Sequence, residues 1–249
     1  MRRGASPYCR RVLPSALRPL AEAPDRSAIL LDIDGVLAPI VPRPEDAAVP
    51  ERTRRLLERL VRRYRLVACL SGRAGADAAR VVGVEGVVYV GSHGLELDPE
   101  ATRWIRNLRE FASGVDWPVE DKGLTVSFHY RPAADEGAAR AYLEQVAGQA
   151  RKAGLVPRFG RKVLELRPPV RADKGTAVVH LVERHRVTYA LYAGDDSTDL
   201  DAFRGLSEAG LEQTVRIAVA SQEGPEELRE LADIVVAGPD ALFELLDGL

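Results

Sequence analysis

Short apolar segments alternate with helix-length amphipathic segments along most of the chain. The first, Ser27–Asp32, is mostly apolar and is followed closely by glycine, which is typical of a buried parallel strand. Residues 51–64 then show helical spacing, with Leu56, Leu57 and Leu60 on one face and arginines on the other. This alternation predicts an α/β fold built on a parallel sheet.

The pattern changes near residue 112 and returns near residue 173. Residues 124–131 alternate between apolar and polar, which predicts a strand with one solvated face. A helix at 136–152 and strands at 155–159 and 162–167 complete a small inserted α+β domain, residues 112–172. The core domain is predicted to comprise residues 1–111 and 173–249, with 1–26 as a basic leader. The other expected core elements are helices at 73–82, 174–185, 198–207 and 239–247 and strands at 66–70, 87–90, 188–193, 215–220 and 233–236.

Composition narrows the function classes. A net charge of −2 over 249 residues argues against a nucleic-acid partner, and no apolar stretch approaches the roughly 20 residues of a membrane span. Cys9 and Cys69 lie far apart, which suits a reducing compartment, and the chain is predicted to be cytoplasmic and monomeric. The first twenty residues hold five arginines and no acid, a bias shared by organellar transit peptides. We expect instead a leader whose Leu13, Leu17 and Leu20 pack on the core.

Two aspartates, Asp32 and Asp34, follow the first predicted strand, and Gly35 permits a sharp turn after them. Close carboxylates repel each other unless a cation or a shared proton lies between them, and Mg²⁺ favours oxygen ligands. In a catalytic interpretation Asp32 is the nucleophile and Asp34 the general acid and then base. An Asp-x-Asp-Gly turn without a ligand would have the same sequence.

Two further motifs lie at expected helix starts. Ser71 and Arg73 follow the strand at 66–70, where a hydroxyl and backbone N–H groups can bind an anion. A plain N-cap serine is the alternative. Lys174 stands in the first turn of the helix at 174–185, where the helix dipole disfavours a positive charge, and a phosphoryl group would explain it.

The last motif contains three aspartates, Asp195, Asp196 and Asp199, between a predicted strand and a helix. A simple helix cap requires one of them, so the cluster predicts a Mg²⁺ site with Asp195 as ligand and the other two acting through water. The four motifs together fit phosphoryl transfer, which depends on positioning and charge neutralisation. The chain has no GxxxxGK[ST] motif, which excludes a P-loop NTPase.

These motifs resemble those of the haloacid dehalogenase superfamily, and the resemblance extends to trehalose-6-phosphate phosphatases over nearly the whole chain from about residue 28. It is carried, in order, by LLDIDGVLAPIVPRPEDA (30–47), LSGR (70–73), GSHGLE (91–96), VEDKGLTVSFHYR (119–131), KVLELRP (162–168), DKGTAV (173–178) and GDDSTDLDAF (194–203). The resemblance implies a Rossmann-like core with a small inserted α/β cap, and a Mg²⁺-dependent phosphatase that hydrolyses trehalose 6-phosphate through an aspartyl-phosphate.

The resemblance also implies residue roles. The catalytic set is Asp32, Asp34, Ser71, Lys174, Asp195 and Asp199, with the metal on Asp32, the carbonyl of Asp34, and Asp195. The implied sugar contacts are Arg73 and His93 from the core and Glu120, Lys122, Arg131, Lys162 and Glu165 from the cap. His129 is interpreted as an ordinary hydrogen-bonded histidine.

Two positions depart from the family pattern: Ser92 replaces a usual Asn, and Leu200 a usual acid. Other sugar phosphates therefore stay open as substrates, namely sucrose 6-phosphate and mannosyl- or glucosyl-3-phosphoglycerate. The carboxylate of a phosphoglycerate could be met by Arg131, Lys162 or Arg167. A catalytically silent sugar-phosphate sensor is the alternative from another class, although this chain keeps the nucleophile and the lysine.

Overall fold

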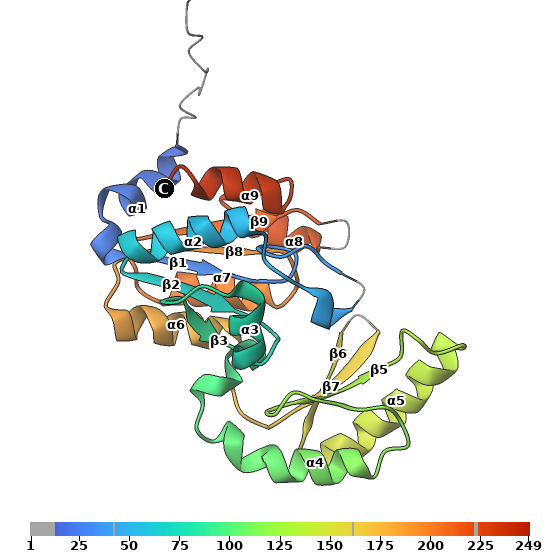
Figure 1. Ribbon diagram of the computed structural model, residues 1–249. Coiled ribbons are helices and arrows are strands. Elements are labelled where there is room, and N and C mark those ends of the chain that lie inside the picture. The colour runs from blue at the N-terminus through green and yellow to red at the C-terminus, as the bar shows by residue number, and fades with distance from the viewer. Residues whose placement is uncertain (1–12, 42, 161, 222–223) are drawn as a thin grey trace, which may run out of the picture.

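The computed structural model describes residues 13–41, 43–160, 162–221 and 224–249. Cys9 and the start of the predicted leader lie outside the described residues. Two sheets organise the described part, a six-stranded sheet in the larger body and a four-stranded sheet beside it (Figure 1).

The larger sheet is parallel and has the strand order β10-β9-β8-β1-β2-β3. Its strands are β1 (Ser27–Leu31), β2 (Leu66–Leu70), β3 (Val88–Val90), β8 (Tyr189–Gly194), β9 (Gln213–Val219) and β10 (Ile234–Val236). From β1 the chain proceeds outward through β2 and β3, and from β8 it proceeds the other way, through β9 and β10. The strand order therefore reverses between β1 and β8, and the carboxyl ends of those two strands form the expected ligand crevice.

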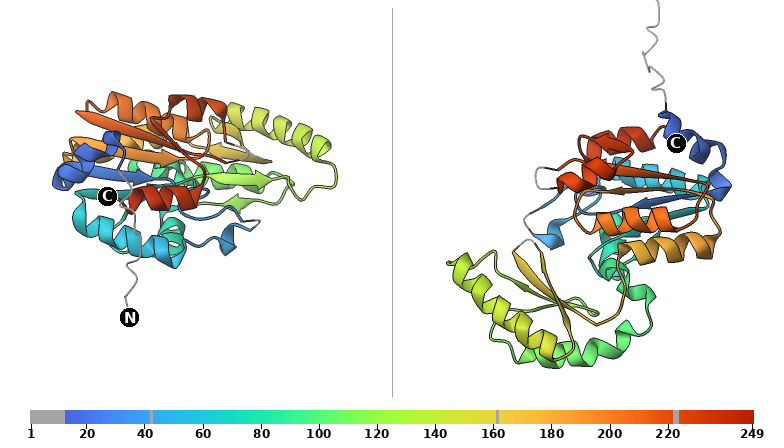
Figure 2. Two further views of the ribbon diagram at one scale, coloured as in Figure 1. Left: turned by 90° about the horizontal axis from the view of Figure 1, so that it is seen from above. Right: turned by 180° about the vertical axis from the view of Figure 1, so that it is seen from behind.

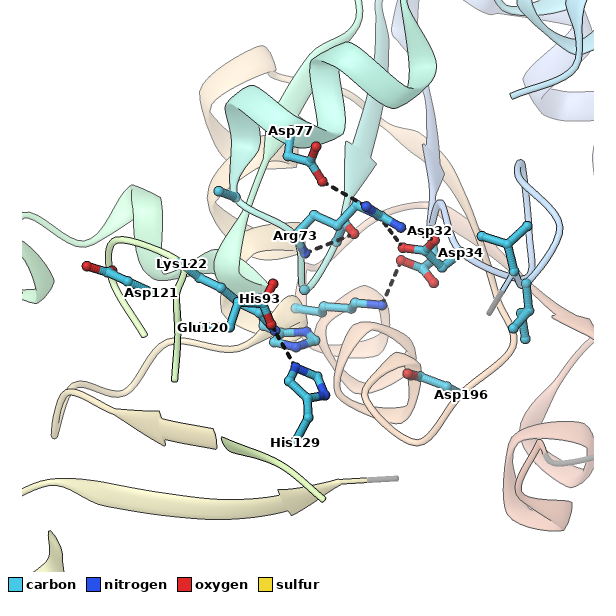
Figure 3. Close-up of a pocket in the computed structure, with 16 residues that line it drawn as sticks. Asp32, Asp34, Arg73, Asp77, His93, Glu120, Asp121, Lys122, His129 and Asp196 are labelled. Carbon is cyan, nitrogen blue, oxygen red and sulfur yellow. Dashed lines mark hydrogen bonds and ion pairs between the residues drawn. The ribbon is translucent and has the colours of Figure 1, made fainter. Parts of the chain in front are cut away.

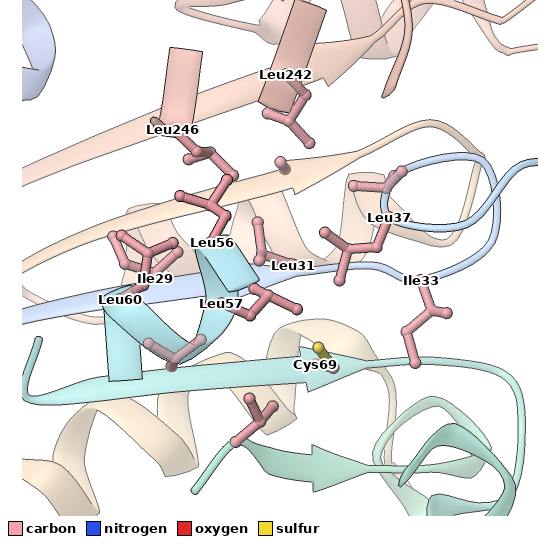
Figure 4. Packing of buried hydrophobic residues seen from close by; sticks show 14 of the residues in the cluster. Ile29, Leu31, Ile33, Leu37, Leu56, Leu57, Leu60, Cys69, Leu242 and Leu246 are labelled. Carbon is pink, nitrogen blue, oxygen red and sulfur yellow. The ribbon is translucent and has the colours of Figure 1, made fainter. Parts of the chain in front are cut away.

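Helices cover both faces of this sheet (Figures 1 and 2). One face carries α1 (Arg18–Glu22), α2 (Glu51–Arg63), α3 (Gly75–Val82) and α9 (Pro239–Leu246), and the other carries α6 (Lys174–His185), α7 (Asp199–Glu208) and α8 (Glu226–Leu231). The apolar face of α2 predicted from its leucines packs on Ile29 and Leu31 of β1 (Figure 4). Leu17 and Leu20 are fully buried in the same cluster, which confirms the predicted docking of this segment.

The smaller sheet is antiparallel, in the order β4-β5-β7-β6. Its strands are β4 (Glu120–Asp121), β5 (Val126–His129), β6 (Val156–Gly160) and β7 (Val163–Arg167). Helices α4 (Ile105–Ser113) and α5 (Glu136–Lys152) cover one face, and the opposite face is turned toward the larger body (Figure 1). The apolar cluster beneath this sheet includes Leu108 and the partly buried Trp104, both of which precede residue 112. The domain division at residues 112 and 172 stays a prediction.

The predicted fold class, a Rossmann-like parallel sheet with a small second sheet, is confirmed. Elements that the sequence analysis did not predict are α1, α4, α8, the two-residue strand β4, and 3₁₀ turns at Ser15–Leu17, Pro24–Arg26, Pro44–Asp46, Ser92–Leu97 and Ala101–Trp104. Cys69 is a buried free thiol, as expected. No helix in the described part of the chain has the length and apolarity needed to cross a bilayer.

Candidate active site

The turn after β1 brings the first two aspartates to the crevice. Asp32 is buried, and its backbone N–H donates to the carbonyl of Ala193 on β8 at 2.9 Å. Gly35 follows with φ +84°, a conformation that a residue with a side chain rarely adopts. A Cβ at position 35 would also lie 2.3 Å from Oδ2 of Asp195. Glycine is therefore required both for the turn and for the close approach of Asp195.

The helix start at Lys174 places a buried cation beside Asp32. The α6 helix is capped by Asp173, whose side chain accepts from the backbone N–H of Thr176 at 2.9 Å. Lys174 is only 1% exposed, and its Nζ lies 3.0 Å from Oδ1 of Asp32 and 2.6 Å from Oδ1 of Asp199. Burial alone would lower the pKa of Lys174, but the two carboxylates outweigh burial and raise that pKa. The ammonium group therefore stays charged.

Asp199 holds this arrangement together with both of its oxygens. Its Oδ1 accepts from Lys174 and from the hydroxyl of Tyr192 at 2.7 Å. Its Oδ2 accepts from the backbone N–H groups of Asp195 and Asp196 at 2.8 and 2.9 Å. The carboxylate thus fixes both the lysine and the acidic loop. Tyr192 was not predicted from the sequence, although a tyrosine at the apolar centre of β8 was the available signal.

Carboxylate oxygens of Asp32, Asp195 and Asp199 all lie within 4.8 Å of one another. Burial is the largest cause that raises the pKa of Asp32, and Asp199, Asp196 and Asp195 raise it further against the opposing effect of Lys174. A single lysine therefore faces several buried carboxylates, so the site favours a further cation. An all-oxygen donor set of this kind fits Mg²⁺.

The side chain of Arg73 binds two aspartates of the protein, Asp34 and Asp77 (Figure 3). Arg73, predicted to contact substrate, directs Nε and Nη2 to the two oxygens of Asp34 at 2.7 and 2.8 Å. Its Nη1 binds Asp77, one helical turn farther along α3, also at 2.7 Å. Ser71 is buried at the end of β2, and its Oγ accepts from the backbone N–H of Arg73 at 3.2 Å. Both oxygens of Asp34 are thus engaged, and Asp77 is a site residue that the sequence analysis missed.

His93 enters the crevice from a strained turn. Ser92 and His93 both have φ +52°, and Gly94 has φ +94°. The ring packs so tightly on Gly72 that a Cβ there would lie 2.6 Å from Nε2. Burial, with smaller effects from Lys174 and Arg167, lowers the pKa of His93 to about 3. The imidazole is therefore neutral at physiological pH.

Two adjoining hollows, of about 480 and 970 Å³, bring core and small-sheet residues to one space. Asp32, Ser71 and Lys174 line the first hollow, together with Glu120 and His129 of the small sheet. The second hollow is lined from the core by the acidic loop, from the small sheet by Ser127 and Glu165, and by Arg131 just after β5. Both hollows share Asp34, Ile40, His93, Lys122 and Asp196.

The predicted sugar contacts are only partly brought together. Oε2 of Glu120 accepts from Nε2 of His129 at 2.7 Å and lies 3.6 Å from Nζ of Lys122 (Figure 3). The hydrogen bond from His129 is the largest cause that lowers the pKa of Glu120. His129 has the hydrogen bond expected of it, but it also lines the hollow. Lys162 lines neither hollow and instead pairs with Glu136 at 2.5 Å. Leu200, the departure from the family pattern, packs on the apolar cluster under α6 and α7.

Comparison with known proteins gives a consistent assignment. A family model described as "Trehalose-phosphatase" matches residues 30–117 and 117–233. A trehalose-phosphate phosphatase of Mycobacterium marinum is 35% identical, over 82% of this chain and 58% of that protein. An uncharacterized glycosyl hydrolase of Mycobacterium tuberculosis is 36% identical, over 77% of this chain but only 16% of that protein.

The chain thus spans little more than half of the first relative and a small part of the second. Among solved structures, the C-terminal domain of trehalose-6-phosphate phosphatase from C. albicans has a TM-score of 0.67. It is 22% identical and covers 96% of this chain and 99% of that domain, a likeness that supports the fold. Because the family model covers most of the sequence, this chain belongs to the trehalose-phosphatase family.

Proposed function

We propose that this chain hydrolyses trehalose 6-phosphate to trehalose and phosphate, with Mg²⁺ as cofactor and Asp32 as nucleophile. The observation that carries the proposal is the buried pair of Asp32 and Lys174 at the carboxyl end of β1, 3.0 Å apart. A lysine held there neutralises charge beside the attacking carboxylate. Family membership supports trehalose 6-phosphate as the substrate.

The reaction has two steps. Asp32 attacks phosphorus, the bond from phosphorus to the sugar oxygen breaks, and Asp34 donates a proton to that oxygen. In the second step Asp34 takes a proton from a water molecule while that water attacks phosphorus. The bond from phosphorus to Asp32 then breaks, which releases phosphate and restores the carboxylate of Asp32. Lys174 and the Ser71 hydroxyl bind the phosphoryl oxygens in both steps. Asp32, Asp195 and the carbonyl of Asp34 would hold Mg²⁺, which would supply further neutralisation of phosphoryl charge.

Asp199 and Asp196 are assigned supporting roles. Since Asp199 accepts four hydrogen bonds within the protein, we assign it to positioning Lys174 and the acidic loop. Asp196 accepts from the backbone and hydroxyl of Thr198 at 2.7 and 2.6 Å, and it retains its predicted role of binding metal through water.

Asp34 must be released before it can act. Arg73 engages both of its oxygens, so neither is available to a leaving group. We infer that a phosphoryl or hydroxyl oxygen of the substrate takes over part of the guanidinium fork when it enters the first hollow. Asp77 retains the arginine nearby during this exchange.

Substrate identity is tested by phosphate release from a panel: trehalose 6-phosphate, sucrose 6-phosphate, glucosyl- and mannosyl-3-phosphoglycerate, and glucose 6-phosphate. Each is assayed with Mg²⁺ and with a chelator. We expect the highest kcat/KM for trehalose 6-phosphate and loss of turnover with the chelator. Preference for a phosphoglycerate would replace the proposed substrate, and binding without phosphate release would indicate a sensor.

The variant Asp32→Asn tests the covalent mechanism. An amide cannot act as the nucleophile, so turnover should be abolished while the fold is kept. Because burial and neighbouring carboxylates disfavour the charged form of Asp32, the melting temperature without Mg²⁺ should stay level or rise. Activity close to wild type would refute the aspartyl-phosphate step. A monomeric state, a cytoplasmic location and the absence of nucleic-acid or membrane partners stay predictions.

A further inference from the structure

A row of four polar residues crosses the face of the small sheet that is turned toward the hollows. Cross-strand pairing aligns Glu120 with Ser127, Ser127 with Glu165, and Glu165 with Arg158, one residue from each strand. Neighbouring residues on β5, such as Phe128, point the other way into the apolar cluster under α4 and α5. Three strand spacings of about 4.8 Å give the row a length of roughly 14 Å. A single sugar ring cannot extend along such a row, whereas a disaccharide can cover most of it.

Ser127 lies near the centre of this row with its hydroxyl unused. It is 0% exposed, and its Oγ has no hydrogen-bond partner among the residues that the structure describes. Thr125 lies two residues earlier and is equally buried, but its Oγ1 donates to Oε1 of Glu165 at 3.1 Å. The threonine is therefore satisfied by holding Glu165, while the serine leaves a buried polar group unpaired. Such groups are costly in a folded protein and call for a specific explanation.

We propose that the Ser127 hydroxyl hydrogen-bonds a hydroxyl of the sugar ring farther from the phosphate. The inference rests on the proposed function and adds a specificity residue to it. Ser127 lines only the second hollow, whereas Asp32 and Lys174 line only the first. The group that meets Ser127 is therefore not the phosphoryl group held beside Asp32 and Lys174, and a sugar ring offers a hydroxyl there. Glu165, held by Thr125 on the adjacent strand, is placed to accept from a second hydroxyl.

The variant Ser127→Ala separates this role from a structural one. The free protein loses no hydrogen bond among the described residues, so its melting temperature should be unchanged or higher. The value of kcat/KM for trehalose 6-phosphate should fall roughly 5- to 20-fold, because the complex loses a hydrogen bond in a buried site. Hydrolysis of p-nitrophenyl phosphate should change by less than about twofold, since that ester has no second ring.

Ser27→Ala is the matched control. Ser27 is also 0% exposed, but its Oγ donates to the carbonyl of Ala23 at 2.7 Å, far from the hollows. Its removal should lower the melting temperature and leave the ratio of the two kcat/KM values unchanged. The two serine variants are thus expected to show opposite patterns of stability and specificity.

The possible outcomes are distinct. An unchanged kcat/KM for trehalose 6-phosphate in Ser127→Ala overturns the inference, as does an equal loss on both substrates or a lowered melting temperature. These results would leave the proposed function intact, because the wild-type enzyme would still hydrolyse the sugar phosphate. Wild-type protein that hydrolyses p-nitrophenyl phosphate but no sugar phosphate would refute the proposed function and the inference with it.

Discussion

Replacing Lys174 with methionine removes the charge from the centre of the site and keeps most of the side chain's length. Nζ lies 3.0 Å from Asp32 and 2.6 Å from Asp199, and all three side chains are buried. The variant therefore leaves two buried carboxylates without their common cation. The loss should appear both in stability and in rate.

The expected stability loss follows from the cost of breaking a buried ion pair, about 3–5 kcal/mol. In a domain of this size each kcal/mol lowers the melting temperature by roughly 2–4 °C, so Lys174→Met should melt roughly 6–20 °C below wild type near neutral pH. Asp32 and Asp199 already have pKa values raised by burial, and without Lys174 they bind protons more readily still. The folded variant then holds more protons than the unfolded chain, so its deficit grows as pH rises and shrinks as pH falls.

Added Mg²⁺ should recover part of the lost stability, because a cation that binds only the folded site stabilises it. Rate should not recover, since the phosphoryl oxygens lose their ammonium partner. We expect kcat/KM to fall by about three orders of magnitude or more. Lys174→Arg should rescue the rate poorly, because a planar fork cannot replace a compact point charge.

The measurements are thermal unfolding near neutral pH and near pH 5, each with and without Mg²⁺, and phosphate release. Lys152→Met, at the exposed end of α5, is the control for loss of a lysine and should change neither quantity. A melting temperature within about 2 °C of wild type, with less than a tenfold loss in kcat/KM, would refute this account of Lys174.

Three further predictions concern the metal site, the pH response and the cap. Gly35→Ala should lower stability and raise the Mg²⁺ concentration for half-maximal activity, because its Cβ would collide with Asp195; an unchanged Mg²⁺ requirement would contradict this. The pKa of His93 is lowered to about 3 in the folded protein and lies near 6.5 in the unfolded chain. The stability contributed by the neutral imidazole is therefore fully present above pH 6.5 and is lost as the pH falls toward 3. Unfolding of His93→Asn should therefore depend less on pH between these limits, and parallel pH curves would count against it. Glu120→Ala and Glu165→Ala should lower kcat and raise KM for trehalose 6-phosphate but change p-nitrophenyl phosphate hydrolysis little, and equal losses on both would indicate a structural role.

Much of the fold was predictable from local pattern alone. The strand at Leu66–Leu70 and the helices at Glu136–Lys152 and Lys174–His185 have the predicted bounds, because apolar periodicity and capping residues act over a few positions. The two-residue strand β4 escaped prediction because so short a segment has no periodicity. Motif spacing likewise identified the strand-end residues, since the carboxyl ends of parallel strands meet at one edge.

Contacts between distant segments were decided only by the tertiary structure. The sequence predicts that Arg73 contacts the substrate. The order of the strands places Arg73 beside Asp34, 39 residues away in the sequence, where the guanidinium group binds both carboxylate oxygens. The predicted substrate contact Lys162 itself has φ +57° and pairs with Glu136 instead of lining the hollows. The unpaired hydroxyl of Ser127 could not be foreseen either, because a missing partner depends on every neighbour at once. Local sequence fixes which residues end each strand, whereas packing of the two sheets decides which side chains they meet.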